Sequence, residues 1–161
     1  MWNRRWKVAW WTWLALCSCA APLSESVSPT VENFTETDAA GNILRIDPDD
    51  WRIQERFRNE VRVRPAFPNP TANGIVSLIV EYNTTAPLGR IDVLATNTAG
   101  NPIFIARWNV AISFGTEFYR LNLAPLAVSG NLNELRGRLF RIRLLDSFGN
   151  LITYGDIKFA D

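Results

Sequence analysis

The side chains of this chain that could do chemistry are carboxylates and guanidinium groups, because histidine is absent and cysteine occurs only twice. Catalytic triads of the Ser-His-Asp and Cys-His types need an imidazole, and so do histidine metal sites. The sequence also has no glycine-rich phosphate loop of the Walker or Rossmann type. We therefore expect no cofactor.

Carboxylate chemistry of the glycosidase kind would need two acids that face each other across a cleft. No spacing in the sequence marks two carboxylates as such a pair, and we expect them to cap turns or to be solvated. The sequence thus predicts a protein that is not an enzyme. The carboxylates considered are Asp47, Asp49, Asp50, Glu55, Glu60, Asp92 and Asp156.

Asp47, Asp49 and Asp50 surround Pro48. Asp-Pro followed by further acids is typical of the start of a helix, here a short turn expected from Pro48 to about Arg56. The alternative is a calcium site, but calcium loops space their ligands more regularly and often turn on a glycine. We predict capping and no metal site.

Arginine alternates with apolar residues in several segments that are expected to be strands. If these strands are neighbours, their guanidinium groups form a stripe that can bind carboxylates or phosphates of an envelope polymer or of a partner protein. The alternative is a solvated sheet face that discourages aggregation. The candidate binding residues are Arg62, Arg64, Arg120, Arg138, Arg141 and Arg143.

The elements that must position these side chains are strands, because hydrophobic residues recur with period two from Val61 onward. Val76, Leu78, Val80 and Tyr82 share one side of such a run. Short strands with no room for crossover helices predict an all-β, antiparallel, immunoglobulin-like sandwich of about seven strands. The expected strands are residues 61–63, 75–82, 89–96, 103–110, 118–123, 139–145 and 151–159.

Three turns share a polar first residue and a Gly-Asn pair, at residues 38–42, 98–101 and 146–150. An Asp or Thr that bonds its own backbone, with a glycine at positive φ, makes a tight hairpin connection. We interpret all three as strand turns.

Several aromatic residues would stack on sugar rings if they formed an exposed row. We expect Trp51 to cover one end of the core, and alternation places Trp108 in the core with Phe104 and Val110. Tyr154 is ambiguous. The aromatic residues considered are Trp51, Tyr82, Trp108, Tyr119 and Tyr154.

The N-terminus has the layout of a secretory signal, with Arg4, Arg5 and Lys7 before an apolar run, 8–16, that is shorter than the roughly 20 residues of a membrane span. Leu16 stands three residues before Cys19, and Ser18 directly precedes it. This pattern resembles the lipobox of bacterial lipoproteins, which implies lipidation of Cys19. Alternatives are cleavage near Ala20 or an uncleaved anchor.

This organisation predicts a signal peptide over 1–18, a flexible tether rich in Ser, Thr, Glu and Pro over 19–37, and one sandwich domain over 38–161. Ala20 is not the Asp that retains some lipoproteins at the inner membrane, so an outer-membrane anchor in the cell envelope is expected. Cleavage removes three of the 17 basic residues and none of the 16 acidic ones. The remaining charge does not indicate nucleic-acid binding.

The second part of the chain, 68–161, carries a Pro-Asn-Pro-Thr segment, a Gly-Arg-Ile-Asp-Val strand at 89–93, a basic apolar strand at 138–144 and a last strand with Lys158. It resembles the immunoglobulin-like C-terminal sorting domains of type IX secretion cargo in Bacteroidota and the FlgD-type Ig-like modules. The resemblance implies a sandwich fold and a bacterial lineage.

Two classes of function follow. The first is a non-catalytic envelope lipoprotein that docks onto a larger assembly through a loop end or a sheet edge, where unpaired backbone groups can bind a partner strand. The second is a glycan- or ligand-binding module. A secreted type IX sorting-domain protein is a further alternative.

Overall fold

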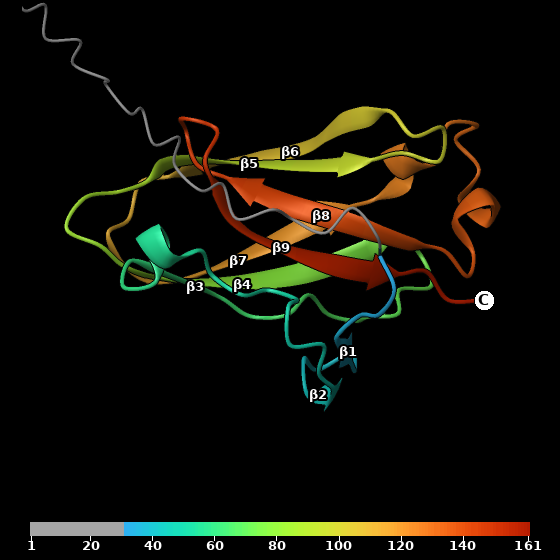
Figure 1. Cartoon of the computed structure of the whole chain (residues 1–161), viewed down its shortest axis with the longest axis horizontal. Coiled ribbons are helices and arrows are strands. Elements are labelled where there is room, and N and C mark those ends of the chain that lie inside the picture. Colours follow the sequence, from blue (N-terminus) through green and yellow to red (C-terminus); the bar gives the residue numbers. More distant parts are fainter. Residues whose placement is uncertain (1–30) are drawn as a thin grey trace, which may run out of the picture.

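Two antiparallel β-sheets form the body of the protein in the computed structural model, which describes residues 31–161. One sheet has the order β3 (Val61–Val63), β4 (Ile75–Asn83) and β7 (Phe114–Asn122). The other has the order β6 (Pro102–Val110), β5 (Gly89–Thr96), β8 (Leu139–Leu145) and β9 (Leu151–Lys158). Figure 1 shows them as two stacked layers. The predicted all-β, antiparallel sandwich is confirmed.

Smaller elements connect and cover these sheets. The short hairpin of β1 (Glu36–Thr37) and β2 (Ile43–Arg45) projects from the layers in Figure 1. Three single turns of 3₁₀ helix follow: η1 (Glu55–Phe57), η2 (Ala124–Leu126) and η3 (Leu132–Leu135).

The core lies between the sheets and follows from alternation along the strands. Val76, Leu78, Val80 and Tyr82 of β4 are all buried, as the sequence predicts. They pack in one cluster with the inward residues of β5 and β8, which include Ile91, Val93, Ile142 and Leu144. Burying an aliphatic side chain of this size contributes about 1.5–3 kcal/mol, so this cluster is the main source of stability.

The three predicted turns are present, each built on a carboxylate or amide that accepts from two backbone N–H groups. Asp38 accepts from Ala40 and Asn42, each at 2.8 Å. Asp146 accepts in the same way from Phe148 at 2.9 Å and Asn150 at 2.8 Å.

The middle turn begins one residue earlier than predicted. Asn97, not Thr98, accepts from the N–H groups of Ala99 at 3.0 Å and Asn101 at 2.9 Å. The hydroxyl of Thr98 bonds instead to the carboxylate of Glu134. An amide mimics the Asp geometry, so Asn97 serves the turn equally well.

The outer edge of β9 is covered by two segments from the first half of the chain. Gln54 donates to the carbonyl of Ile152 at 2.9 Å, and Trp51 donates to that of Tyr154 at 2.6 Å. Further along, Thr71 donates to Lys158 at 2.9 Å. These bonds satisfy backbone groups that an edge strand otherwise presents to solvent.

Asn69 joins this edge to the N-terminal segment. Its side-chain amide donates to Thr35 at 2.8 Å and to Asp156 at 2.9 Å, and its oxygen accepts from Lys158 at 2.9 Å. Its backbone exchanges two hydrogen bonds with Thr37. Each donor and acceptor of this buried residue is therefore matched, as burial requires.

The predicted tether is wrong at its C-terminal end. Phe34, Thr35 and Thr37 are buried, and the hydroxyl of Thr37 donates to Ala66 at 2.7 Å. Small polar residues predict disorder only where no other residue forms hydrogen bonds with them. Here both Asn69 and Asp50 form hydrogen bonds with Thr35. The rest of the tether, 19–30, and the signal peptide, 1–18, lie outside the described residues.

Two further local predictions differ from the structure. The helical turn expected from Pro48 to about Arg56 is a turn at 48–51 followed by η1, because Trp51 adopts a positive φ of 59°. β7 begins at Phe114 rather than 118, since Gly115 and Thr116 pair with Tyr82 and Glu81.

Phe104 is also misplaced by simple alternation. The pairing of β5 with β6 shifts between Val93 and Leu94, so Phe104 is opposite Leu94 while Trp108 is opposite the buried Ile91. Phe104 is consequently exposed, and Val110 is buried as predicted. A β-bulge moves every side chain beyond it to the other face of the sheet.

Replacing Gly155 by alanine should destabilise the fold by about 3 kcal/mol, because a Cβ at this position overlaps the indole ring of Trp51. Urea unfolding of the full chain measures the loss. In a Trp51→Ala background, Gly155→Ala should lower the free energy of unfolding much less, because the indole ring is absent. Equal costs in both backgrounds would contradict this packing.

Candidate functional site on the three-stranded sheet

The six arginines predicted as one stripe lie on two different sheets. Arg62 belongs to β3 and Arg120 to β7, and Arg64 directly follows β3. Arg138 precedes β8, which contains Arg141 and Arg143. β3, β7 and β8 are not neighbours in either sheet. The stripe as predicted is therefore wrong, because adjacency of strands cannot be inferred from alternation within each of them.

Three of these arginines do share a surface, the outer face of the three-stranded sheet. Arg62 pairs across the strands with Glu81, and Arg120 with Ser77. Both arginines are exposed, and the buried residues of β4 alternate with these outward positions. Arg64 reaches the same face through its ion pair with Glu81, at 2.6 Å.

The charge of this outer face is positive. Arg62, Arg64 and Arg120 supply three guanidinium groups to this face. Glu81 supplies the one carboxylate at its outward strand positions. Arg64 uses that carboxylate through both Nε and Nη2. Arg62 and Arg120 thus have charge available to an external anion, for which guanidinium geometry is well suited.

The β7 side of the outer face carries two exposed aromatic side chains. Phe118 is opposite Ile79, and 73% of its surface is exposed. Phe114 is opposite Asn83 and is 68% exposed. Large side chains this exposed are uncommon on soluble proteins unless a partner covers them, so they mark a candidate interface.

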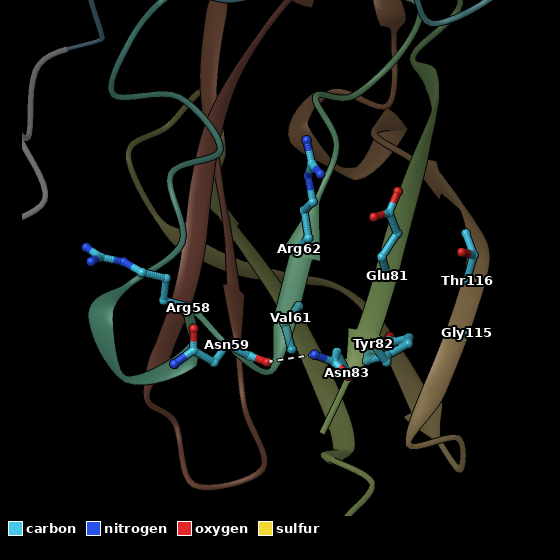
Figure 2. A pocket seen from close by; sticks show the side chains of 9 residues that line it. All are labelled: Arg58, Asn59, Val61, Arg62, Glu81, Tyr82, Asn83, Gly115 and Thr116. Carbon is cyan, nitrogen blue, oxygen red and sulfur yellow. Dashed lines mark hydrogen bonds between the residues drawn. The ribbon is translucent and has the colours of Figure 1, made fainter. Parts of the chain in front are cut away.

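A groove of about 660 Å³ opens at one end of this face. Figure 2 shows Arg62 and Glu81 extending from neighbouring strands, with Arg58 turned away from them. Arg58 forms an ion pair with Glu55, and the Asn83 amide donates to the carbonyl of Asn59 at 3.5 Å. Polar and charged side chains line the groove: Arg58, Asn59, Arg62, Glu81, Asn83 and Thr116. This lining offers mostly hydrogen-bond donors and suits carboxylate or phosphate ligands.

Arg141 has a structural role on the other sheet. It forms a two-pronged ion pair with Asp156, at 2.8 Å from Nε and 2.6 Å from Nη2. Its guanidinium also lies 4.4 Å from the ring centre of Tyr154. Because Asp156 is buried, removing Arg141 would leave an uncompensated charge. Arg141 therefore stabilises the fold through its ion pair with Asp156.

The structure brings Asp47, Asp49, Asp50 and Asp156 of the considered carboxylates into one region. Each of three has a clear structural partner. Asp49 accepts from the Tyr154 hydroxyl at 3.0 Å. Asp50 accepts from the N–H groups of Thr35 at 2.7 Å and Asp156 at 2.9 Å, and Asp156 binds Arg141.

Asp47, the fourth carboxylate of this region, accepts only weakly from the N–H of Asp49, at 3.5 Å. Outside the region, Asp92 binds Arg107 at 2.7 Å and Arg90 at 3.2 Å, and Glu55 binds Arg58. Over residues 31–161, no group of three His, Cys, Asp or Glu side chains is arranged to hold a metal ion.

The aromatic residues considered for sugar stacking do not form an exposed row. Trp51 and Tyr82 are buried, which confirms that Trp51 covers part of the core. Trp108 and Tyr119 stack on each other at 4.0 Å between ring centres, and Tyr154 is half-buried under Arg141. The large exposed aromatics are instead Phe104, Phe114, Phe118 and Phe148.

Sequence reasoning missed Phe114, Thr116 and Phe118. In the sequence Phe118 looks like any apolar strand residue, and nothing there indicates that β7 is an outer strand of its sheet. The one available signal was that Phe118 alternates with Tyr119 and Leu121, which would place it on the opposite face.

Cys19 lies outside the described residues. Within 31–161, no helix has the length and apolar character needed to cross a membrane. Compared with known proteins, the sequence matches no protein-family model and no curated protein.

The stability of the fold should depend on the protonation of Asp50. Burial raises the pKa of its carboxyl from 3.8 to about 7, against the opposing effect of its backbone hydrogen bonds. Between about pH 4 and pH 7 the folded chain therefore keeps a proton that the unfolded chain has lost. The free energy of unfolding should fall by about 2 kcal/mol from pH 5 to pH 8.

Urea titrations of the full chain at pH 5, 6, 7 and 8 measure this dependence. An Asp50→Asn variant should be less stable at pH 5 and should show a flatter pH profile, since it has no proton to lose. A variant with the same slope as the unsubstituted chain would show that another group is responsible.

Proposed function

We propose that this protein is a non-catalytic, lipid-anchored protein of the cell envelope that docks an acidic partner onto the outer face of its three-stranded sheet. The observation that carries the proposal is the surface around Phe118. There an exposed apolar residue lies among three arginines, with Glu81 as the one carboxylate in the outward strand positions of this sheet.

The contacts on this face support binding rather than catalysis. Arg62 and Arg120 supply guanidinium groups, and the groove beside Arg62 adds amide and hydroxyl groups from Asn59, Asn83 and Thr116. Charge-assisted hydrogen bonds of this kind orient carboxylates or phosphates, while Phe118 supplies apolar contact area. A partner protein with an acidic surface, or an acidic envelope polymer, has the matching chemistry.

The anchor in this proposal rests on Leu16, Ser18 and Cys19 and on the resemblance to lipoprotein signals. A lipid on Cys19 would hold the sandwich at the outer membrane, where a docking subunit needs no enzymatic activity of its own. We infer that the chain recruits or positions a larger envelope component there.

Replacing Arg62 and Arg120 together by glutamine should weaken binding to poly-glutamate and to isolated cell envelopes by at least about tenfold, because a hydrogen bond to a charged group is worth roughly 1.5 kcal/mol or more. The loss should shrink as salt is raised. Co-sedimentation over a range of salt concentrations is the measurement.

The matched control replaces Arg136 and Arg138 by glutamine. These exposed arginines precede β8 and lie away from the three-stranded sheet. Replacing them changes the net charge by the same amount as replacing Arg62 and Arg120. Equal loss in both double variants would mean that net charge, and not this face, governs binding.

Replacing Cys19 by alanine should release the protein from the outer membrane. Intact mass of the protein from its native host should give a chain that begins at an acylated Cys19, and membrane fractionation should find the variant in the soluble fraction. An unmodified, soluble wild-type chain would remove the anchor and favour the secreted sorting-domain alternative.

A further inference from the structure

Four strands form the edges of the two described sheets, and three of them are protected. β9 is covered by the bonds from Trp51, Gln54 and Thr71. β6 begins with Pro102, which has no N–H, and its pairing with β5 is shifted by a bulge. β3 has only three residues. Short length, proline and bulges are devices that prevent edge-to-edge pairing.

β7 has none of these devices. It is nine residues long, its pairing with β4 is regular from Ile75 to Asn83, and it contains neither proline nor lysine. Among residues 31–161 no strand pairs with its outer side. A long, regular and partly apolar edge is a template for another strand.

The backbone groups on this open edge can be assigned. Arg64 donates to Ile79, and Asn83 donates to Glu60, so these odd-numbered residues of β4 face β3. The even-numbered residues Val76 to Tyr82 therefore face β7, where their partners are Leu121, Tyr119, Glu117 and Gly115. The N–H and C=O groups of Thr116, Phe118 and Arg120 consequently point outward.

We propose that β7 pairs antiparallel with β7 of a second copy of this chain, about a two-fold axis at Phe118. In this register Phe118 faces Phe118 of the second copy, and Thr116 faces Arg120 of the second copy. The two phenylalanines, each 73% exposed in the single chain, contact one another side by side on the outer face. Aromatic pairs that lie directly opposite stabilise antiparallel strands.

The charges on the edge favour the same register. The two Arg120 side chains lie four residues apart along the pair, about 13 Å, which exceeds the screening length of roughly 8 Å at physiological salt. Each Arg120 faces Thr116, whose neighbour on β4 is Glu81. Arginine of one copy therefore points toward the carboxylate of the other.

The pairing is closed, because each copy uses the same edge and the other edges of the two main sheets are protected. It joins two three-stranded sheets into one with Arg62, Arg64 and Arg120 of both copies on a single face. A multivalent acidic partner would then bind two sites at once. The pairing itself does not depend on the proposed function.

A Phe118→Cys variant of the full chain in its native membranes tests the pairing. Opposed, hydrogen-bonded residues have Cα atoms about 5.5 Å apart, within the range that a disulfide spans. Mild oxidation should give a disulfide-linked dimer on a non-reducing gel. The unsubstituted chain, in which Cys19 is the cysteine left after the predicted removal of residues 1–18, gives the background.

Phe104→Cys is the matched control, since Phe104 is also an exposed phenylalanine, at 52%, but belongs to β6. It should remain monomeric. Thr116→Cys alone should remain monomeric too, whereas Thr116→Cys with Arg120→Cys should cross-link. A monomeric Phe118→Cys variant, equal cross-linking of Phe104→Cys, or a monomeric double variant would overturn the proposal.

Phe118→Asp adds a second measurement. It places two carboxylates against each other, and the dissociation constant of the dimer in detergent solution should rise at least tenfold, while Phe104→Asp should leave it unchanged. Arg62→Gln lies two strands from the edge and should affect poly-glutamate binding but not cross-linking. Failure of the pairing and failure of the proposed function can thus be told apart.

Discussion

The hydrogen bonds of Asn69 hold together the two ends of the described part of this chain. Its side chain bridges Thr35 and the last strand, at Asp156 and Lys158, and its backbone pairs with Thr37. Without this residue the carbonyl of Thr35 would lose its side-chain donor, and the segment whose N–H donates to Asp50 would lose one of its attachments. This one amide therefore joins the N-terminal segment to the edge strand that Trp51, Gln54 and Thr71 cover.

The outer edge of β9 is covered by other parts of the chain, whereas the outer edge of β7 is not. The first half of the chain covers β9, but the connection from β6 to β7 is short and leaves no segment to cover the outer side of β7. Trp108 and Tyr119 stack and fill the space between these two strands. The core is therefore closed on this side, while backbone groups and phenylalanines of β7 stay accessible. The surface best suited to a partner is the one that the chain does not cover itself.

The strands could be predicted from the sequence because alternation is a local property. Val76 to Tyr82 show it clearly, and the ranges of β4, β5 and β8 agree with the prediction within a residue. The order of strands is not local, which is why Arg62 and Arg141 were expected together and lie on different sheets. The prediction that Phe104 lies in the core was wrong for a similar reason. The bulge depends on how β5 pairs with β6, and not on the sequence of β6 alone.

The candidate site was half predictable. Arg62, Arg64 and Arg120 were singled out by type and spacing, and the structure places them on one face. Phe118 and Thr116 were not, because their importance comes from the position of β7 at an edge. The burial of Phe34 to Thr37 could not be anticipated either, since their partner Asn69 is more than thirty residues away.

The attachment of the N-terminal segment to Asn69 also determines which hydrogen bonds would break first under a pulling force. Tension applied through residue 31 against a load held at β7 would reach the hydrogen bonds of Thr35 and Thr37 before it reached the core strands. These few bonds would yield first, since the sheets themselves are joined by long ladders. Their release would free residues 31–37 from Asp50 and Asn69, while the bonds of Trp51, Gln54 and Thr71 keep the edge of β9 covered. A pulled molecule would thus lengthen at its N-terminal segment without offering a second strand for pairing.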